Sequence, residues 1–138
     1  MMRKMTIDSS VIIASLLEKE PRHSEALEIW NSILSGENIA IMPYSVFVEV
    51  VAAIKRRTGS EALALEIKDE LLNTDTISFV ILDDKSALEA AEIAAKSGVR
   101  GMDALLIQTS KEFETELISF DEEMMQKSKI ILNSSSSF

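Results

Sequence analysis

Short apolar runs alternate along the chain with longer segments in which apolar residues recur every three or four positions. Short runs of this kind are typical of buried β-strands, and we expect five of them, at residues 5–8, 39–42, 77–82, 117–120 and 130–132. The longer segments indicate helices that connect the strands. Regular alternation of strands and helices predicts an α/β protein with a three-layer α/β/α architecture and a mainly parallel central sheet flanked by helices.

The clearest helix is expected at residues 23–34. Leu27, Trp30, Ile33 and Leu34 recur there at three- and four-residue spacing, which places them on one face of a helix. We expect that face to be buried.

Helix ends carry their own signals. A helix at 46–57 is predicted from its length, from Pro43 in the first turn and from the cationic ending before Gly59, although its valines by propensity alone favour a strand. Ser60 is a good cap for a following helix, and the two helices should form an antiparallel hairpin. Two more helices are expected, one from Asp83 or Asp84 to Gly98 and one from Met102 towards Phe113.

Composition narrows the range of functions. The chain has 138 residues, which is one domain, here assigned to residues 1–132 with a Ser-rich tail at 133–138 that we expect to be disordered. Cysteine is absent, which excludes disulfides, thiolate metal sites and cysteine nucleophiles. The N-terminal segment fits neither a signal peptide nor a membrane span, so we expect a soluble cytoplasmic protein with no membrane partner. The net charge of −9 disfavours broad electrostatic binding to nucleic acid, which would need a local basic patch or metal ions.

Four acidic residues occupy positions that suggest a site. Asp8 closes one expected strand and Asp121 follows another, at the sheet edge where α/β proteins bind ligands. Glu49 is the only charge in an apolar stretch, and Asp103 lies in the first turn of a helix. Each also has an ordinary explanation: Asp8 and Asp121 as helix caps, Glu49 as part of a polar stripe, and Asp103 as an anion favoured by the helix dipole.

A cluster of carboxylates is costly without a cation, because like charges repel and raise one another's pKa. Mg²⁺ and Mn²⁺ prefer such oxygen ligands, and they can activate water and stabilise the leaving oxygen in phosphodiester hydrolysis. Sequence order alone does not show that the four residues meet in space.

A resemblance to a known family bears on whether the four acidic residues meet in space. The segments Ile7-Asp8-Ser9-Ser10-Val11-Ile12, Val48-Glu49-Val50, Gly101-Met102-Asp103-Ala104-Leu105-Leu106 and Ile118-Ser119-Phe120-Asp121 occur in an order and spacing that resemble the PIN-domain family, particularly the VapC-type toxin ribonucleases. The resemblance extends from Met5 to Leu132. Two positions depart from the common pattern: Ser9 stands where Thr is frequent, and Phe120 stands where a small polar residue often precedes the last acid.

The resemblance implies an endoribonuclease dependent on Mg²⁺ or Mn²⁺, the toxin of a toxin–antitoxin pair, with an RNA substrate, a cognate antitoxin and a homodimeric state. It implies that Asp8, Asp103 and Asp121 are metal ligands and that Glu49 binds a second metal or orients water. It also implies that Ser9 and Ser119 shape the site.

Basic residues near these motifs are candidates for RNA binding. Lys55, Arg56 and Arg57 are positioned to contact phosphates, or to stabilise a helix end. Arg100 precedes Asp103 by three residues and can orient a phosphate or pair with a carboxylate.

Two other functions compete with the nuclease. A catalytically silent PIN-like module would bind a protein partner or nucleic acid without cutting it. A receiver-type phosphoacceptor domain also gathers aspartates at strand ends, but it requires a Lys at a late strand end, where this chain has Asp121.

Overall fold

A four-stranded parallel sheet forms the centre of the molecule in the computed structural model, which describes residues 1–135. Its strands are β1 Lys4–Ile7, β2 Ile39–Pro43, β3 Ile77–Val80 and β4 Glu116–Ile118, in the order β3-β2-β1-β4. All pairings are parallel, so the carboxyl ends of the strands meet at one edge. β1 and β2 run from that edge directly into helices.

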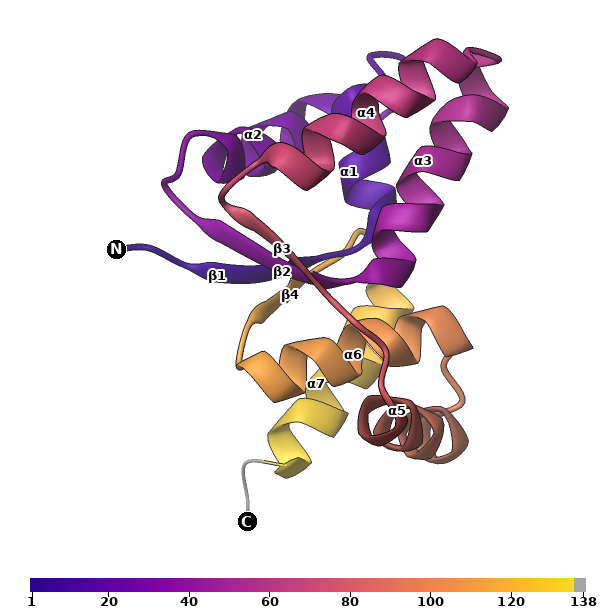
Figure 1. The fold of residues 1–138 in the computed structure, drawn as a ribbon. Coiled ribbons are helices and arrows are strands. Elements are labelled where there is room, and N and C mark those ends of the chain that lie inside the picture. Colours follow the sequence, from indigo (N-terminus) through magenta and orange to yellow (C-terminus); the bar gives the residue numbers. More distant parts are fainter. Residues whose placement is uncertain (136–138) are drawn as a thin grey trace.

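Helices cover both faces of the sheet (Figure 1). One layer contains α1 Ser9–Leu16, α2 His23–Leu34, α3 Tyr44–Thr58 and α4 Glu61–Asn73, and the other contains α5 Asp84–Ser97, α6 Gly101–Phe113 and α7 Glu122–Ser135. This arrangement confirms the predicted three-layer architecture. Within residues 1–135, every helix is too short or too polar to cross a membrane.

The central strand β1 is buried on both sides, which explains its apolar sequence. Met5 and Ile7 are almost inaccessible, and so is Thr6 between them. Thr6 Oγ1 donates to the carbonyl oxygen of Ile41 at 2.7 Å and lies 2.5 Å from Thr115 Oγ1. The buried hydroxyl of the strand is therefore satisfied, and it ties β1 to β2 and to the residue before β4.

The predicted glycine stops at Gly59 and Gly98 and the predicted caps at Ser60 and Asp83 are confirmed. α3 ends at Gly59, whose φ of 73° is a left-handed conformation that favours glycine. Ser60 Oγ accepts a hydrogen bond from the Leu63 amide at 3.0 Å and begins α4, which packs against α3 as a hairpin. Asp83 caps α5 in the same way, and α5 ends at Gly98. Pro43 is the last residue of β2 and the residue before α3, one position earlier than a first-turn proline.

The prediction of a fifth strand at residues 130–132 is wrong, because these residues lie inside α7. Helical spacing explains the apolar run: Met124 and Ser128 are buried one turn apart, Ile131 packs against the core, and Ile130 is exposed. The helix continues to Ser135, three residues into the segment that we expected to be a tail. Residues 136–138 lie outside the described part of the chain.

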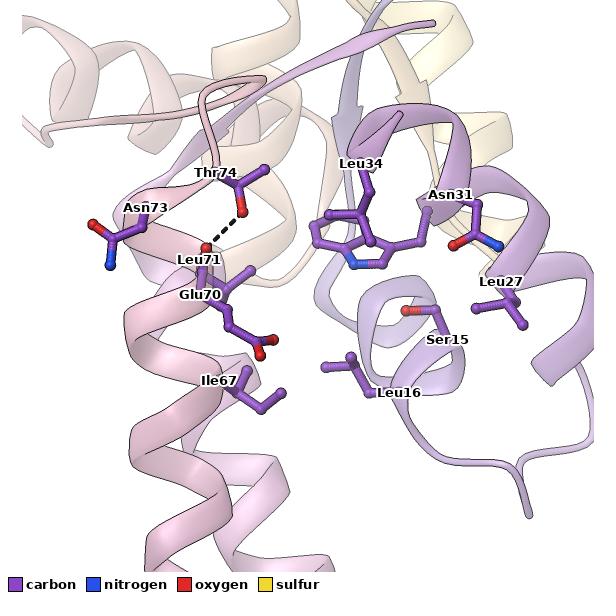
Figure 2. Close-up of a pocket in the computed structure, with 11 residues that line it drawn as sticks. Ser15, Leu16, Leu27, Asn31, Leu34, Ile67, Glu70, Leu71, Asn73 and Thr74 are labelled. Atoms are coloured by element: carbon purple, nitrogen blue, oxygen red, sulfur yellow. Dashed lines mark hydrogen bonds between the residues drawn. The ribbon is translucent and has the colours of Figure 1, made fainter. Parts of the chain in front are cut away.

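The buried face of α2 also differs from the prediction. Ala26, Trp30 and Ile33 are buried, whereas Leu27 and Leu34 are 36% and 50% exposed. Both leucines line an open pocket of about 440 Å³ that Trp30 also lines, between α2, the end of α1 and α4 (Figure 2). The shift of the buried face by one residue lets the small side chain of Ala26 pack closely against its neighbours.

Candidate active site

Asp8 stands at the carboxyl end of β1, one residue before α1. Its side chain makes no capping hydrogen bond to the helix. Instead, Ser119 Oγ and Ser10 Oγ donate to Asp8 Oδ2 at 2.8 Å and 3.0 Å. Ser119 comes from the end of β4, beside β1 in the sheet, so two elements that are distant in sequence hold one carboxylate in place.

Glu49 joins the same group of side chains through Ser9. Ser9 Oγ lies 3.0 Å from Glu49 Oε2 and 3.5 Å from Asp8 Oδ1. A hydroxyl has one proton, so the shorter contact is the donated bond, and Ser9 stands between the two carboxylates. One turn before Glu49 in α3, Ser45 Oγ is buried with no hydrogen-bond partner among the described residues. The Glu49 side of the site therefore contains a hydroxyl with unused bonding capacity.

Asp103 lies in the first turn of α6, and only 15% of its side chain is exposed. Burial raises the pKa of its carboxyl group, the negative charges of Asp8 and Asp121 raise it further, and Arg100 partly opposes the shift. The contributions of Asp8 and Asp121 show that three carboxylates from three different elements lie close enough to repel one another.

Asp121 has two roles in the structure. Its Oδ1 accepts a hydrogen bond from the Met124 amide at 3.1 Å, which is the helix cap that the sequence allowed as an alternative. Its Oδ2 lies 3.9 Å from Arg100 Nη2. The Asp121 amide donates to Ser119 Oγ at 3.1 Å, so Ser119 contacts both Asp8 and Asp121. One oxygen of Asp121 thus stays available to the cluster.

Arg100 extends over the cluster from the start of α6. Its Nε lies 3.5 Å from Asp103 Oδ2, and its Nη2 reaches Asp121. The side chain is 82% exposed, and ion pairs in such positions contribute little free energy, about 0–1 kcal/mol. Arg100 therefore neutralises part of the cluster and can be displaced at low cost.

The three basic residues at the end of α3 do not act together. Lys55 Nζ donates to the carbonyl oxygen of Gly59 at 3.0 Å, so it stabilises the end of the helix. Arg56 is exposed. Arg57 forms an ion pair with Glu20 and lines a pocket beside the carboxylate cluster. Of the three, the structure brings only Arg57 to the edge of the site.

Sequence reasoning missed three residues next to the cluster. Ser10 binds Asp8, and Arg22 places its guanidinium 3.7 Å from the centre of the Phe120 ring. In the sequence, Phe120 stood out only because it departs from the residue type that often precedes the last acid of the PIN-domain motif. Arg22 precedes α2, far from Phe120 in sequence, and no local signal connects the two residues.

The donor set suits a hard divalent cation. It consists of the carboxylates of Asp8, Glu49, Asp103 and Asp121 together with serine hydroxyls, all of them oxygen ligands. Within residues 1–135, however, no three acidic side chains already stand at ligand spacing. The ligand atoms are therefore of the type that Mg²⁺ and Mn²⁺ prefer. For such an ion to bind, the carboxylates would have to move closer together and the Arg100 side chain would have to move aside.

The sequence and the fold of the chain can be compared with those of known proteins. The sequence model described as PIN domain matches residues 5–130. The fold is similar to that of VapC20 from Mycobacterium tuberculosis, a toxin that cleaves the sarcin–ricin loop, with a TM-score of 0.75 and 16% identity over 88% of this chain and 93% of that one. It is also similar to a chain of a toxin–antitoxin complex from Klebsiella pneumoniae, with a TM-score of 0.57 and 16% identity over 85% and 84%. None of the curated proteins compared with the chain matches it.

Proposed function

The chain belongs to the PIN domain family, and from this premise we propose that it is a metal-dependent endoribonuclease and the toxin of a toxin–antitoxin pair. The observation that carries the proposal is the convergence of Asp8, Asp103 and Asp121, since Ser119 contacts both Asp8 and Asp121 and Arg100 contacts both Asp103 and Asp121. Carboxylates that lie this close repel one another, and the repulsion destabilises the fold unless a cation relieves it. A metal-binding function would explain why the protein keeps these acidic residues together.

Each acidic residue has a proposed role. Asp8, Asp103 and Asp121 would hold Mg²⁺ or Mn²⁺, and Glu49 would hold a second ion or orient the attacking water. A bound ion supplies activation of water and charge stabilisation at the scissile phosphate. Ser119 fixes the orientation of Asp8 by donating to one of its oxygens, and Ser9 fixes that of Glu49. Hydroxyl donors of this kind hold metal ligands in position before the ion arrives.

The substrate and partners follow from the same premise. We propose RNA as the substrate, the cytoplasm as the compartment and a cognate antitoxin as the protein partner. One of the two similar structures is a toxin–antitoxin complex, which supports a partner of this kind. A homodimer remains a proposal from family resemblance. With a net charge of −9, the enzyme needs local cations to hold a polyanion, and Arg57 and Arg100 are the predicted basic residues that border the site.

Metal removal tests the proposed chemistry. We expect the purified protein to cleave members of a mixed pool of structured RNAs in Mg²⁺ or Mn²⁺. EDTA should stop cleavage, and an excess of either ion should restore it, because the ion both activates water and neutralises the phosphate charge that the carboxylates would otherwise repel. Gel electrophoresis of end-labelled RNA measures this. Cleavage that persists unchanged in EDTA would overturn the metal-dependent mechanism.

A single observation favours the silent module as a second candidate. The guanidinium of Arg100 lies between Asp103 and Asp121, where its charge partly replaces that of an ion. In a silent module this arrangement would be the final state, and RNA or a partner protein would bind without being cut. The two candidates differ in one result: an Arg100→Gln variant should bind Mn²⁺ more tightly if the cluster is a metal site, and should bind none if it is not.

A further inference from the structure

A second pocket adjoins the carboxylate cluster on the side of Ser9 and Ser10. It has a volume of about 350 Å³, and its lining includes Ser9, Ser10, Arg22, Arg57 and Phe120. The two serines are the same residues that bind Asp8 and Glu49. The pocket therefore shares Ser9 and Ser10 with the carboxylate cluster.

Two of the residues that line this pocket are arginines, although the protein as a whole is acidic. Arg22 and Arg57 outnumber the single acid among its lining residues, Glu20, whereas the whole chain carries −9. Both arginines are about half exposed and paired on the surface, Arg57 with Glu20 and Arg22 with Glu25. Exposed ion pairs are weak, so a phosphate group can replace Glu20 as the partner of Arg57.

An aromatic surface borders the same pocket. Phe120 is half-buried directly before Asp121, and the Arg22 guanidinium lies over its ring. The contact between Arg22 and Glu25, with three hydrogen bonds of 2.8 to 3.0 Å, holds the guanidinium in place. Aromatic rings and guanidinium planes are the two side-chain surfaces on which unpaired bases stack in complexes with single-stranded RNA.

We propose that this pocket binds one unpaired nucleotide next to the scissile phosphate, with its base packed against the Arg22–Phe120 pair and a flanking phosphate beside Arg57. The inference rests on the proposed ribonuclease function and names the residues that would hold a nucleotide beside the cut. A base can pack against this surface only when it is unstacked from its neighbours. A volume of about 350 Å³ lies at the lower end of the usual range for small-molecule sites, which suits one nucleotide and not several.

Base stacking can be tested without any cleavage. Short oligoribonucleotides, each with 2-aminopurine at a different single position, are titrated with wild-type protein and with the Phe120→Leu variant in EDTA. We expect fluorescence quenching at one probe position with wild-type protein. We expect Phe120→Leu to lose that quenching and to bind about 5- to 100-fold more weakly, as for loss of one stacked base. An otherwise identical RNA with an abasic site at that position should bind both proteins equally weakly.

Matched variants separate stacking from general damage. Phe79→Leu makes the same substitution on β3, at the opposite edge of the sheet, and should bind and quench like wild type. Arg22→Ala alters the stack from the exposed loop before α2 and should repeat the Phe120→Leu result even if that variant folds poorly. Arg3→Ala removes an arginine that is paired with Glu116 away from the site, and it should have no effect.

Two results would overturn the inference: no quenching of any probe by the wild-type protein, or equal binding by wild type, Phe120→Leu and Arg22→Ala. These failures are distinct from failure of the nuclease proposal. If RNA is never cleaved in any metal but quenching depends on Phe120 and Arg22, the nucleotide pocket stands and the nuclease does not. If RNA is cleaved and neither variant changes binding or quenching, the nuclease stands and the pocket does not.

Discussion

The Asp103→Asn variant should lose RNA cleavage and gain stability. We expect cleavage to fall by about 10³-fold, because the charge stabilisation that a metal supplies is worth several kcal/mol and each 1.36 kcal/mol is a factor of ten in rate. We expect the melting temperature in EDTA at neutral pH to rise, because the variant removes a buried carboxylate that Asp8 and Asp121 repel. A purely structural role for Asp103 predicts the opposite change in stability.

The gain in stability should depend on pH. Because burial raises the pKa of Asp103 in the folded protein, ionising this group costs folding free energy. The cost is absent below the ordinary carboxyl pKa, where the group is protonated in both states, and it grows as the pH rises through the raised pKa. The difference in melting temperature between Asp103→Asn and wild type should therefore be largest at neutral pH. It should shrink towards zero as the solution is acidified.

Differential scanning fluorimetry across a pH series measures this difference. Asp75→Asn changes an exposed aspartate in the turn before β3 and should leave both activity and melting temperature near the wild-type values. Adding Mn²⁺ should stabilise the wild-type protein more than Asp103→Asn, since an ion that binds only the folded state adds to stability. A lower melting temperature for Asp103→Asn in EDTA would contradict the cluster as described.

The largest loss of stability is expected from Trp30→Ala. Trp30 is 4% exposed on the inner face of α2 and borders the pocket between α1, α2 and α4. Replacing a buried tryptophan by alanine removes apolar burial and leaves a cavity, at a cost of about 3–5 kcal/mol. For a domain of this size, the melting temperature should fall by about 10–20 °C.

Circular dichroism is the suitable readout, because Trp30 is the only tryptophan and its fluorescence disappears with it. Leu34→Ala is the matched control from the next turn of α2. Leu34 is half exposed, so we expect a loss of under about 1 kcal/mol. Equal losses in the two variants would show that the burial of α2 differs from the structure described.

Local sequence signals predicted much of the fold. The αL glycine at Gly59 and the caps at Ser60 and Asp83 act within a few residues, so they could be identified from sequence. The apolar run at residues 130–132 was misleading because three apolar residues fit a strand as well as a helix face. Only the burial of Met124 and Ser128 on the same face distinguishes the two, and that depends on packing against α5 and α6.

For the candidate site, too, local signals could be read from the sequence and contacts between distant segments could not. The four acidic residues were visible in the sequence because each stands at a strand end, at a helix start or alone in an apolar stretch. Their proximity was not visible, since it depends on strand order and on the face that α6 presents. The Arg22–Phe120 contact joins two distant segments, and the choice among Lys55, Arg56 and Arg57 depends on the direction in which α3 ends.

Binding of Mn²⁺ to the wild-type protein and to Asp8→Asn, measured by isothermal titration calorimetry alongside RNA cleavage in the same buffers, tests the central claim most directly. Asp8 is the carboxylate that Ser10 and Ser119 hold in place, so its neutralisation should remove a ligand without moving the fold. We predict that Asp8→Asn binds Mn²⁺ more than about tenfold more weakly and does not cleave RNA. Equal Mn²⁺ affinity in the two proteins, or cleavage that survives in Asp8→Asn, would contradict a metal-dependent ribonuclease built on these carboxylates.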